Sequence, residues 1–228
     1  MTDSPVPLAT HHHADLSIDQ RLALRTAATR LHSEFGDHFG VETIERFLHS
    51  SYDQFAGRAT VPNFLPLLAE RWARQRLTAL ARVEGKITDT KPTVLFLCTH
   101  NAGRSQMALG FFNHLAGDQG VAWSGGSEPG TEINPAAIAA MAEVGIDITR
   151  EFPKPWTDEI VQASDIVVTM GCGDACPVFP GHRYVEWVLA DPAGQSVDAV
   201  RPIRDDIEER VRRLLAELGI TPASCSKS

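Results

Sequence analysis

Residues 94–107, VLFLCTHNAGRSQM, decide the fold of this chain. The first residues of the stretch, 94–97, are all apolar and predict a buried strand that ends at Cys98. A short turn over residues 99–103 follows, and Arg104 then opens a segment whose apolar side chains recur at helical spacing. A loop of this length between a strand and a helix can turn its backbone N–H groups inward beside the positive end of the helix, which predicts an anion-binding site.

The cysteine and the arginine predict the chemistry of that site. The helix N-terminus and the guanidinium of Arg104 both favour the thiolate form of Cys98. The planar fork of Arg104 can also hold two oxygens of a tetrahedral oxyanion. An alternative is that Cys98 is a buried residue at a strand end and Arg104 an ordinary helix-start residue. The position of this C-x5-R pattern, between an apolar strand and a helix, favours a nucleophilic cysteine in an oxyanion loop.

The composition is that of a globular protein. The chain has 228 residues, of which 43% are hydrophobic and 22% are charged, and its formal net charge is -8. This acidic balance argues against general nucleic-acid binding. No apolar run approaches the ~20 residues that a membrane span needs, and the first residues lack the apolar core of a signal peptide. We therefore expect a cytoplasmic protein that binds neither nucleic acid nor membrane.

A second motif, MGCGDACP at residues 170–177, carries Cys172 and Cys176. Half a zinc site is one interpretation, but the sequence offers no second pair of ligands at a suitable spacing. Two buried structural thiols are another, although the neighbouring glycines, aspartate and proline argue against it. A redox relay fits best: Cys172 would attack Cys98, and Cys176 would then resolve that disulfide. Cys225, in a polar segment, is expected to be an idle thiol.

A third motif, Leu-Ala-Asp-Pro-Ala at residues 189–193, places Asp191 in a turn that Pro192 fixes. A carboxyl group near a thiolate and an oxyanion can protonate a leaving oxygen. The alternative is a plain turn residue, since aspartate is common before proline. Because Cys98, Cys172 and Asp191 each follow a predicted strand, we expect them at one edge of a parallel sheet, which favours an acid role for Asp191.

The first part of the chain predicts a small helical bundle. Residues 1–15 are polar, include three consecutive histidines, and are expected to form a disordered tail. Apolar stripes at helical spacing predict helices over residues 17–35, 41–55 and 63–83. Ser17 or Asp19 could cap the first of these helices, and Asn63 the third. We expect a three-helix domain over residues 16–86, with a core thin enough to gain stability from pairing.

Beyond a linker, the pattern changes to strands that alternate with helices. Short apolar runs predict further strands at residues 121–124, 165–170 and 183–189. Amphipathic segments predict helices at residues 104–116, 135–144, 157–162 and 198–218. Asn134 should cap the second of these helices, and Pro202 should start or bend the last. The alternation indicates an open α/β sheet, with the strand at 165–170 near its centre, in a domain over residues 92–220 that leaves a tail at 221–228.

The motifs carry a resemblance to a known family. CTHNAGRS after an apolar strand, with DPAG at residues 191–194, resembles the low-molecular-weight protein tyrosine phosphatase family, and CTHNAGRSQMA with GCGDACP resembles its arsenate reductase branch. The resemblance covers residues 93–218 and implies a four-stranded parallel sheet flanked by helices. Residues 15–83 resemble the helical extension of some actinobacterial-type arsenate reductases, which is thought to mediate dimerisation.

The resemblance also implies roles for the motif residues. The catalytic residues would be Cys98, Arg104, Cys172, Cys176 and Asp191. Among them the first cysteine would be the nucleophile, the other two the redox pair, and the aspartate the acid. The substrate-binding residues would be Thr99, His100, Asn101, Ala102, Gly103, Arg104 and Ser105. In this loop the asparagine would shape the backbone, and the serine would form a hydrogen bond to the thiolate.

These observations lead to the hypothesis that the protein reduces arsenate to arsenite, for arsenic detoxification. The reductant would be thioredoxin, acting on an internal disulfide relay without a tightly bound cofactor or metal, and phosphate or sulfate would bind as substrate analogues. Some thioredoxin-linked members have a further cysteine where this chain has Gly103, so an external thiol such as mycothiol, with mycoredoxin, is one alternative. A phosphatase is another, since it needs only Cys98, Arg104 and Asp191. A DNA-binding sensor is disfavoured by the net charge, and the expected assembly is a homodimer through the N-terminal helices.

Overall fold

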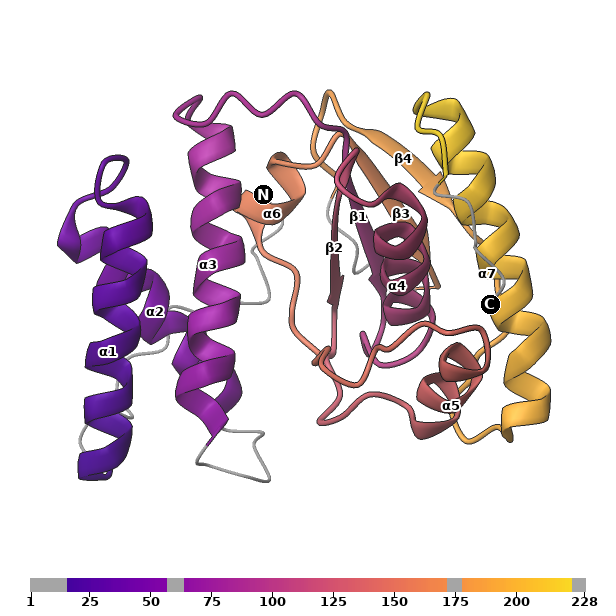
Figure 1. Ribbon diagram of the computed structural model, residues 1–228, viewed down its shortest axis with the longest axis horizontal. Helices are drawn as coiled ribbons and strands as arrows, with labels where there is room; N and C mark the ends of the chain where they lie inside the picture. The colour runs from indigo at the N-terminus through magenta and orange to yellow at the C-terminus, as the bar shows by residue number, and fades with distance from the viewer. Residues whose placement is uncertain (1–15, 57–63, 172–177, 223–228) are drawn as a thin grey trace. The chain divides into compact units, whose positions relative to one another are not determined.

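The computed structural model describes residues 16–56, 64–171 and 178–222, and these residues form two compact units (Figure 1). The helical unit consists of the described residues within Met1–Asp89 together with Thr157–Ala163. The α/β unit consists of the described residues within Thr90–Trp156 and Ser164–Ser228. The short segment Thr157–Ala163 thus groups with the N-terminal helices, although it lies in the sequence between two strands of the sheet.

The described part of the helical unit contains α1 (Ile18–Phe35), α2 (Val41–Ala56), α3 (Leu65–Val83) and α6 (Asp158–Gln162). Ser17 caps α1 in a capping box with Gln20, as one of the two expected caps. Phe64 occupies the N-cap position of α3 without a side-chain hydrogen bond, and Asn63, the predicted cap, lies outside the described residues. The core of the unit includes the fully buried side chains of Leu31, Ile44, Leu48, Trp72 and Leu77.

A parallel sheet of four strands forms the centre of the α/β unit, in the order β2-β1-β3-β4. The strands are β1 (Thr93–Cys98), β2 (Val121–Gly126), β3 (Ile166–Met170) and β4 (Arg183–Glu186). Strand β1 lies between β2 and β3, and all of its residues are buried, as its apolar run predicted. Cys98 pairs in register with Gly126 and with Met170, so the carboxyl ends of three strands meet at this cysteine.

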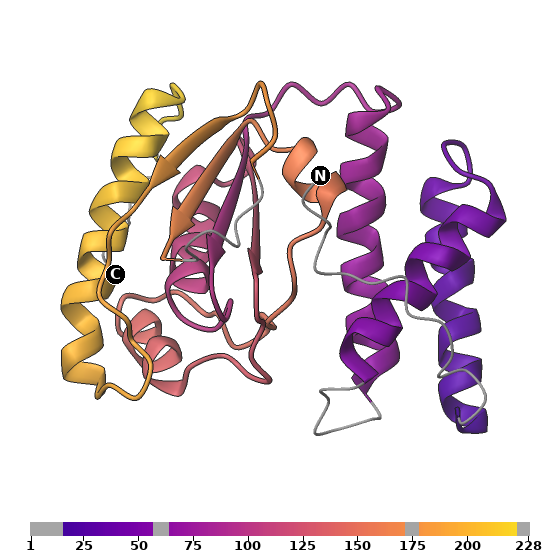
Figure 2. The same ribbon diagram turned by 180° about the vertical axis from the view of Figure 1, so that it is seen from behind.

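Three helices cover one face of this sheet: α4 (Arg104–Ala116), α5 (Pro135–Glu143) and α7 (Val197–Glu217). Figure 1 shows α4 in front of the central strands, and Figure 2, from behind, shows the strands in front of α4. Alternate residues of β1, namely Val94, Phe96 and Cys98, enter the apolar core that these helices close. The predicted four-stranded parallel sheet with flanking helices and an N-terminal helical region is confirmed.

Strand β4 is shorter than predicted. The apolar pattern predicted a strand over residues 183–189, but β4 ends at Glu186. The N–H of Trp187 still donates to the carbonyl of Thr169 at 2.8 Å. The neighbouring strand β3 ends at Met170, so the ladder between the two strands ends there in the part of the chain that the structure describes.

Helix α7 contains its proline rather than starting at it. The helix begins at Val197, and the Oγ of Ser196 caps it, so of the two predicted roles of Pro202, to start or to bend the helix, the first is wrong. Proline removes one hydrogen bond but has a backbone φ that suits a helix. The helix continues because apolar residues on both sides of the proline, Val200 and Ile207, are completely buried in the core of the unit.

Candidate active site

The loop between β1 and α4 begins after Cys98 and ends at Arg104. Cys98 is buried, with 2% of its surface exposed. Asn101 has a φ of 47° and is the one residue other than glycine with a positive φ in the described part of the chain. Asparagine tolerates this left-handed conformation better than most residues, and it allows the chain to turn sharply between the strand and the helix.

The backbone carbonyls of this loop point outward. Three of them accept hydrogen bonds at 2.9 Å from N–H groups of the segment after β2, in the pairs Thr99–Glu128, His100–Gly130 and Ala102–Asn134. The carbonyl of Asn101 accepts at 2.9 Å from the side-chain amide of Gln106. Because a C=O and the next N–H of a trans peptide point in opposite directions, the N–H groups that follow these carbonyls face the other side of the loop. Those N–H groups could bind an anion on that side.

A chain of buried side chains leads to the sulfur of Cys98. The Nδ2 of Asn101 donates to the Oγ of Ser105 at 2.8 Å, and this oxygen lies 3.0 Å from the Sγ of Cys98. The Oδ1 of Asn101 accepts from the N–H of Lys154 at 2.9 Å and from Nε2 of Gln106 at 3.1 Å, which fixes the orientation of the amide. Because Ser105 accepts from Asn101, its own hydroxyl proton is available to the sulfur. A donated proton stabilises a negatively charged sulfur more than a neutral one.

Gln106 and Lys154 are members of this network that the sequence analysis missed. Both are completely buried. The Nζ of Lys154 donates to the carbonyl of Phe152 at 3.3 Å and lies 3.6 Å from the carboxylate of Glu151, which balances its charge. Gln106 donates to the same carbonyl at 3.2 Å. Its place directly after the loop motif could have drawn attention to Gln106, whereas nothing in the sequence pattern singles out Lys154.

The structure brings Arg104 and Asp191 together. The Nη2 of Arg104 lies 3.7 Å from the Oδ1 of Asp191, and 11% of the arginine side chain but 57% of the aspartate side chain is exposed. The same Oδ1 accepts from the N–H of Ala193 at 3.2 Å. The carboxyl group is therefore open to solvent on one side and faces the guanidinium on the other. This arrangement could deliver a proton to an oxyanion that Arg104 holds.

The end of β3 fits closely against the loop. The hydroxyl of Thr99 donates to the carbonyl of Gly171 at 2.9 Å. Gly171 has a φ of 73°, and a Cβ at this position would lie 3.0 Å from Nη1 of Arg104, so both the backbone and the arginine favour glycine here. Cys172 and Cys176 of the predicted relay come next in the chain, and they lie outside the described residues.

Two further loop residues hold neighbouring segments. His100 is exposed, and its Nδ1 lies 3.0 Å from the carbonyl of Glu128. A Cβ on Gly103 would lie 2.6 Å from Cγ of Pro192. The lack of a side chain at Gly103 therefore lets the segment that carries Asp191 approach the loop.

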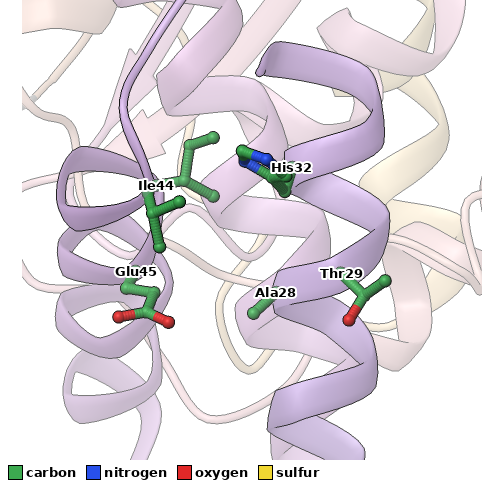
Figure 3. Close-up of a pocket in the computed structure, with 6 residues that line it drawn as sticks. Ala28, Thr29, His32, Ile44 and Glu45 are labelled. Carbon is green, nitrogen blue, oxygen red and sulfur yellow. The ribbon is translucent and has the colours of Figure 1, made fainter.

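Two cavities in the described residues differ from the site around Cys98. One, of about 210 Å³, lies in the helical unit and is lined by Ile44, His32 and Glu45, among other residues (Figure 3). A second cavity, of about 400 Å³, lies beside Asp191 and the first turns of α7. Within the described ranges, no group of three or more His, Cys, Asp or Glu side chains could hold a metal ion. None of the described helices combines the length and the apolar character needed to cross a bilayer.

A parallel sheet that brings Cys98, Arg104 and Asp191 to its carboxyl edge defines the class of this protein, an α/β protein with a C-x5-R loop. Residues 93–221 match the family described as low molecular weight phosphotyrosine protein phosphatase, and the chain belongs to this family. Residues 24–81 match the family described as protein-tyrosine-phosphatase-like, N-terminal domain. The family predicted from the motifs is thus confirmed.

Similar proteins carry the name of one branch of the family. Arsenate reductase 1 of Staphylococcus epidermidis is 43% identical over 125 residues, which are 53% of this chain and 93% of that protein. Arsenate reductase 1 of Bacillus cereus is 41% identical over 135 residues, 58% of this chain and 98% of that protein. A solved structure, the Corynebacterium glutamicum thioredoxin-dependent arsenate reductase Cg_ArsC1', is 41% identical with a TM-score of 0.78 and covers 86% of this chain and 96% of its own.

Proposed function

We propose that this protein reduces arsenate to arsenite, with Cys98 as the nucleophile. The observation that carries the proposal is the buried chain from Asn101 through Ser105 to the sulfur of Cys98. This series of hydrogen bonds offers a donor to the sulfur of Cys98, at the start of the loop that ends in Arg104. The names of the relatives from Staphylococcus epidermidis and Bacillus cereus support arsenate as the substrate. The similarity to a thioredoxin-dependent enzyme over 86% of the chain supports thioredoxin as the reductant.

Arsenate would bind in the loop as a tetrahedral oxyanion. Its oxygens would accept hydrogen bonds from the backbone N–H groups of the loop, whose carbonyls are bound on the outer side. The guanidinium of Arg104 would hold two further oxygens. The proposed substrate-binding residues are Thr99, His100, Asn101, Ala102, Gly103, Arg104 and Ser105. Phosphate and sulfate share this shape and would compete with arsenate.

The reaction would proceed through three cysteines. The Cys98 thiolate attacks arsenic, and an As–O bond breaks as Asp191 gives a proton to the leaving hydroxyl, which departs as water. Cys172 then attacks the sulfur of Cys98, and the S–As bond breaks with its electron pair left on arsenic, which leaves as arsenite. Two thiols are oxidised to a disulfide as arsenic gains two electrons. Cys176 displaces Cys98 from that disulfide, and thioredoxin reduces the resulting Cys172–Cys176 bridge.

Hydrolysis of a phosphoester is a second candidate function, because the family description names phosphotyrosine phosphatases. It would use Cys98, Arg104 and Asp191 in the same roles, with water in place of Cys172 as the second nucleophile. Transfer of arsenic to an external thiol such as mycothiol, regenerated by mycoredoxin, would use Cys98 without the internal relay. The two reductive routes differ in which thiol releases arsenite.

A coupled assay tests these proposals. NADPH oxidation is followed with arsenate, thioredoxin and thioredoxin reductase, and hydrolysis of p-nitrophenyl phosphate is measured beside it. We expect turnover of arsenate that requires thioredoxin, no turnover by Cys98→Ser or Cys172→Ser, and wild-type turnover by the control Cys225→Ser. Turnover by Cys172→Ser at the wild-type rate would refute the relay. Hydrolysis of the ester at a higher kcat/KM than arsenate reduction would favour the phosphatase.

We also propose that the chain has two domains. The domain over residues 92–220 would carry the reaction, and the domain over residues 16–86 would mediate homodimerisation. Exposed apolar side chains in the helical unit support this assembly: Ile18, Leu22, Val41, Phe64 and Leu67 are 51–75% exposed. Light scattering should give the mass of a dimer for the wild type and of a monomer for Leu22→Glu, and a monomeric wild type would contradict the proposal. A reaction that depends on reduced thiols suits the cytoplasm, where we place it.

A further inference from the structure

Asn134, the N-cap of α5, binds both the loop that follows Cys98 and the segment that carries Asp191. Its backbone N–H donates to the carbonyl of Ala102 at 2.9 Å, and its Nδ2 donates to the carbonyl of Pro192 at 2.9 Å. Its Oδ1 accepts from the first N–H groups of α5, at 2.8 and 3.3 Å. One residue thus joins three segments that are far apart in the sequence.

Capping alone does not require asparagine at this position. Aspartate, serine and threonine offer an acceptor oxygen at an N-cap about as well. Asparagine alone among these residues adds an N–H donor in the side chain. In this chain the donor of Asn134 goes to Pro192, 58 residues further on. The donor can therefore be removed while the cap is kept.

Pro192 is held from two sides. A Cβ on Gly103 would lie 2.6 Å from its Cγ, so the proline ring lies directly against the loop. Its carbonyl accepts both from Asn134 and, at 3.2 Å, from the N–H of Gln195. Asp191 immediately precedes this proline, and 57% of its side chain is exposed. The position of the carboxyl group therefore depends on where Pro192 is held.

We propose that Asn134 is a positioning residue for the acid step. Its side-chain amide holds Pro192, and through it Asp191, at the place from which the carboxyl group reaches an oxygen of bound arsenate. This inference rests on the proposed function, in which Asp191 is the acid. The hydrogen bonds of the Asn134 side chain go to the backbone of α5 and of Pro192, so the side chain would act through the position of Asp191 rather than on the reacting atoms.

Two cap-preserving substitutions test the inference. Asn134→Ser and Asn134→Asp keep an acceptor oxygen at the N-cap and lose the amide donor. For Asn134→Ser, the midpoint of thermal unfolding should stay within about 2 °C of the wild type. Asn134→Ala, which also loses the cap, should lower it. For Asn134→Ser, kcat for arsenate should fall about fivefold, with KM changed less than about twofold because the binding loop keeps its groups. Asn134→Asp should lose more, because its carboxylate would face the carbonyl of Pro192.

A double-variant cycle separates positioning from a general loss of structure. The rate of the first chemical step is measured in single turnovers for Asn134→Ser, Asp191→Asn and the double variant. If Asn134 acts through Asp191, Asn134→Ser should change the rate less than about 1.5-fold once the acid is gone. Equal losses in both backgrounds would overturn the inference.

A measurement without turnover distinguishes this inference from the proposed function. Deuterium uptake by the backbone N–H groups of Asp191 and of residues 193–195 should rise in Asn134→Ser relative to the wild type. Unchanged uptake would overturn the inference whatever the protein reduces. Full arsenate turnover by Asp191→Asn would instead refute the role of Asp191 as the acid. If uptake still rose in Asn134→Ser, the contact between Asn134 and Pro192 would stand, and only the proposed function would have failed.

Discussion

The helical unit and the α/β unit both bury polar side chains, but their hydrogen-bond networks end differently. In the helical unit, Arg76 is 7% exposed and donates to Glu159 at 2.6 Å and to the hydroxyl of Ser50 at 2.8 Å. Its guanidinium carbon also lies 4.6 Å from the centre of the Phe47 ring. A carboxylate, a hydroxyl and an aromatic ring thus stabilise the charge of the arginine. We call this network closed, because it links structural groups to one another and leads to no candidate catalytic group.

The buried network of the α/β unit ends instead at the sulfur of Cys98, the proposed nucleophile. Two donors, from Gln106 and Lys154, fix the amide of Asn101, and the amide donates to the hydroxyl of Ser105, whose oxygen lies 3.0 Å from the sulfur of Cys98. Buried polar groups are costly unless they are satisfied, so both networks must be well ordered. We infer that the network around Arg76 serves stability, whereas the network that ends at the proposed nucleophile serves chemistry. Three experiments can test this distinction.

The largest effect is expected from a substitution of Asn101, which interrupts the network that leads to Cys98. Asn101→Ala removes the Oδ1 that accepts from the backbone N–H of Lys154 and places alanine at a φ of 47°, whereas Gln106 keeps two backbone carbonyls as acceptors. The two losses should lower the free energy of unfolding by about 3 kcal/mol and slow alkylation of Cys98 by iodoacetamide by about tenfold or more. Denaturant unfolding and the alkylation rate at pH 7 measure the two effects separately.

Asn101→Gly is the matched control, because glycine adopts a positive φ without strain but has no amide. It should recover part of the stability and none of the alkylation rate. If Asn101→Gly alkylated at the wild-type rate, the backbone conformation rather than the hydrogen-bond chain would account for the reactivity of Cys98.

Much of the fold could be predicted because its signals are local. Helix α4 spans the residues that its apolar stripe and flanking glycines predicted, and β1 extends the predicted run by one residue at each end. Strand β4 was predicted too long because the length of a paired strand depends on its neighbour, which no local pattern contains. The packing of α6 against α3 was missed for the same reason, since an ion pair between Arg76 and Glu159 joins residues 83 apart.

The site divides in the same way. Cys98, Asn101, Arg104 and Ser105 lie within one short motif; the spacing predicted the cysteine and the arginine, and the family resemblance implied the other two. The contact of Lys154 with Asn101 spans 53 residues, and that of Asn134 with Pro192 spans 58. A lysine or an asparagine in a turn-rich segment reads as a surface or capping residue until the packing of the whole unit is known.

A smaller effect, confined to stability, is expected from the closed network. Arg76→Met leaves the carboxylate of Glu159, whose side chain is 15% exposed, beside an apolar side chain, and the free energy of unfolding should fall by about 3 kcal/mol. The alkylation rate of Cys98 in the folded protein should change less than about twofold, because no hydrogen bond of its network is touched. Denaturant unfolding and the same alkylation assay check both statements.

The double variant Arg76→Met with Glu159→Met is the control for this experiment. Removing both charges should restore part of the lost stability, because a buried apolar pair carries no unpaired charge. A large loss of Cys98 reactivity in Arg76→Met would show that the networks of the two units are coupled, and the distinction drawn between them would fail.

The smallest effect is expected at an exposed ion pair of the α/β unit. Arg201 donates to both carboxylate oxygens of Glu143, at 2.8 and 2.6 Å, and these hydrogen bonds lower the pKa of Glu143 to about 2. The pKa in the unfolded chain stays near the ordinary value of 4.5. The stabilisation is therefore fully present above about pH 4.5 and is lost as the pH falls toward 2. Midpoints of thermal unfolding measured from pH 6 to pH 2 should fall more steeply for the wild type than for Glu143→Gln.

Glu209→Gln provides the matched control, since the pair of Glu209 with Arg213 is a helical surface pair at 3.1 Å with side chains 63–70% exposed. Exposed pairs of this kind contribute little, so Glu209→Gln should follow the wild-type curve across the acid range. If Glu143→Gln also followed the wild type, the link between α5 and α7 through Arg201 would carry no stability. The pair of Arg76 with Glu159 would then stabilise the protein more than the pair of Arg201 with Glu143, because its side chains are more shielded from solvent.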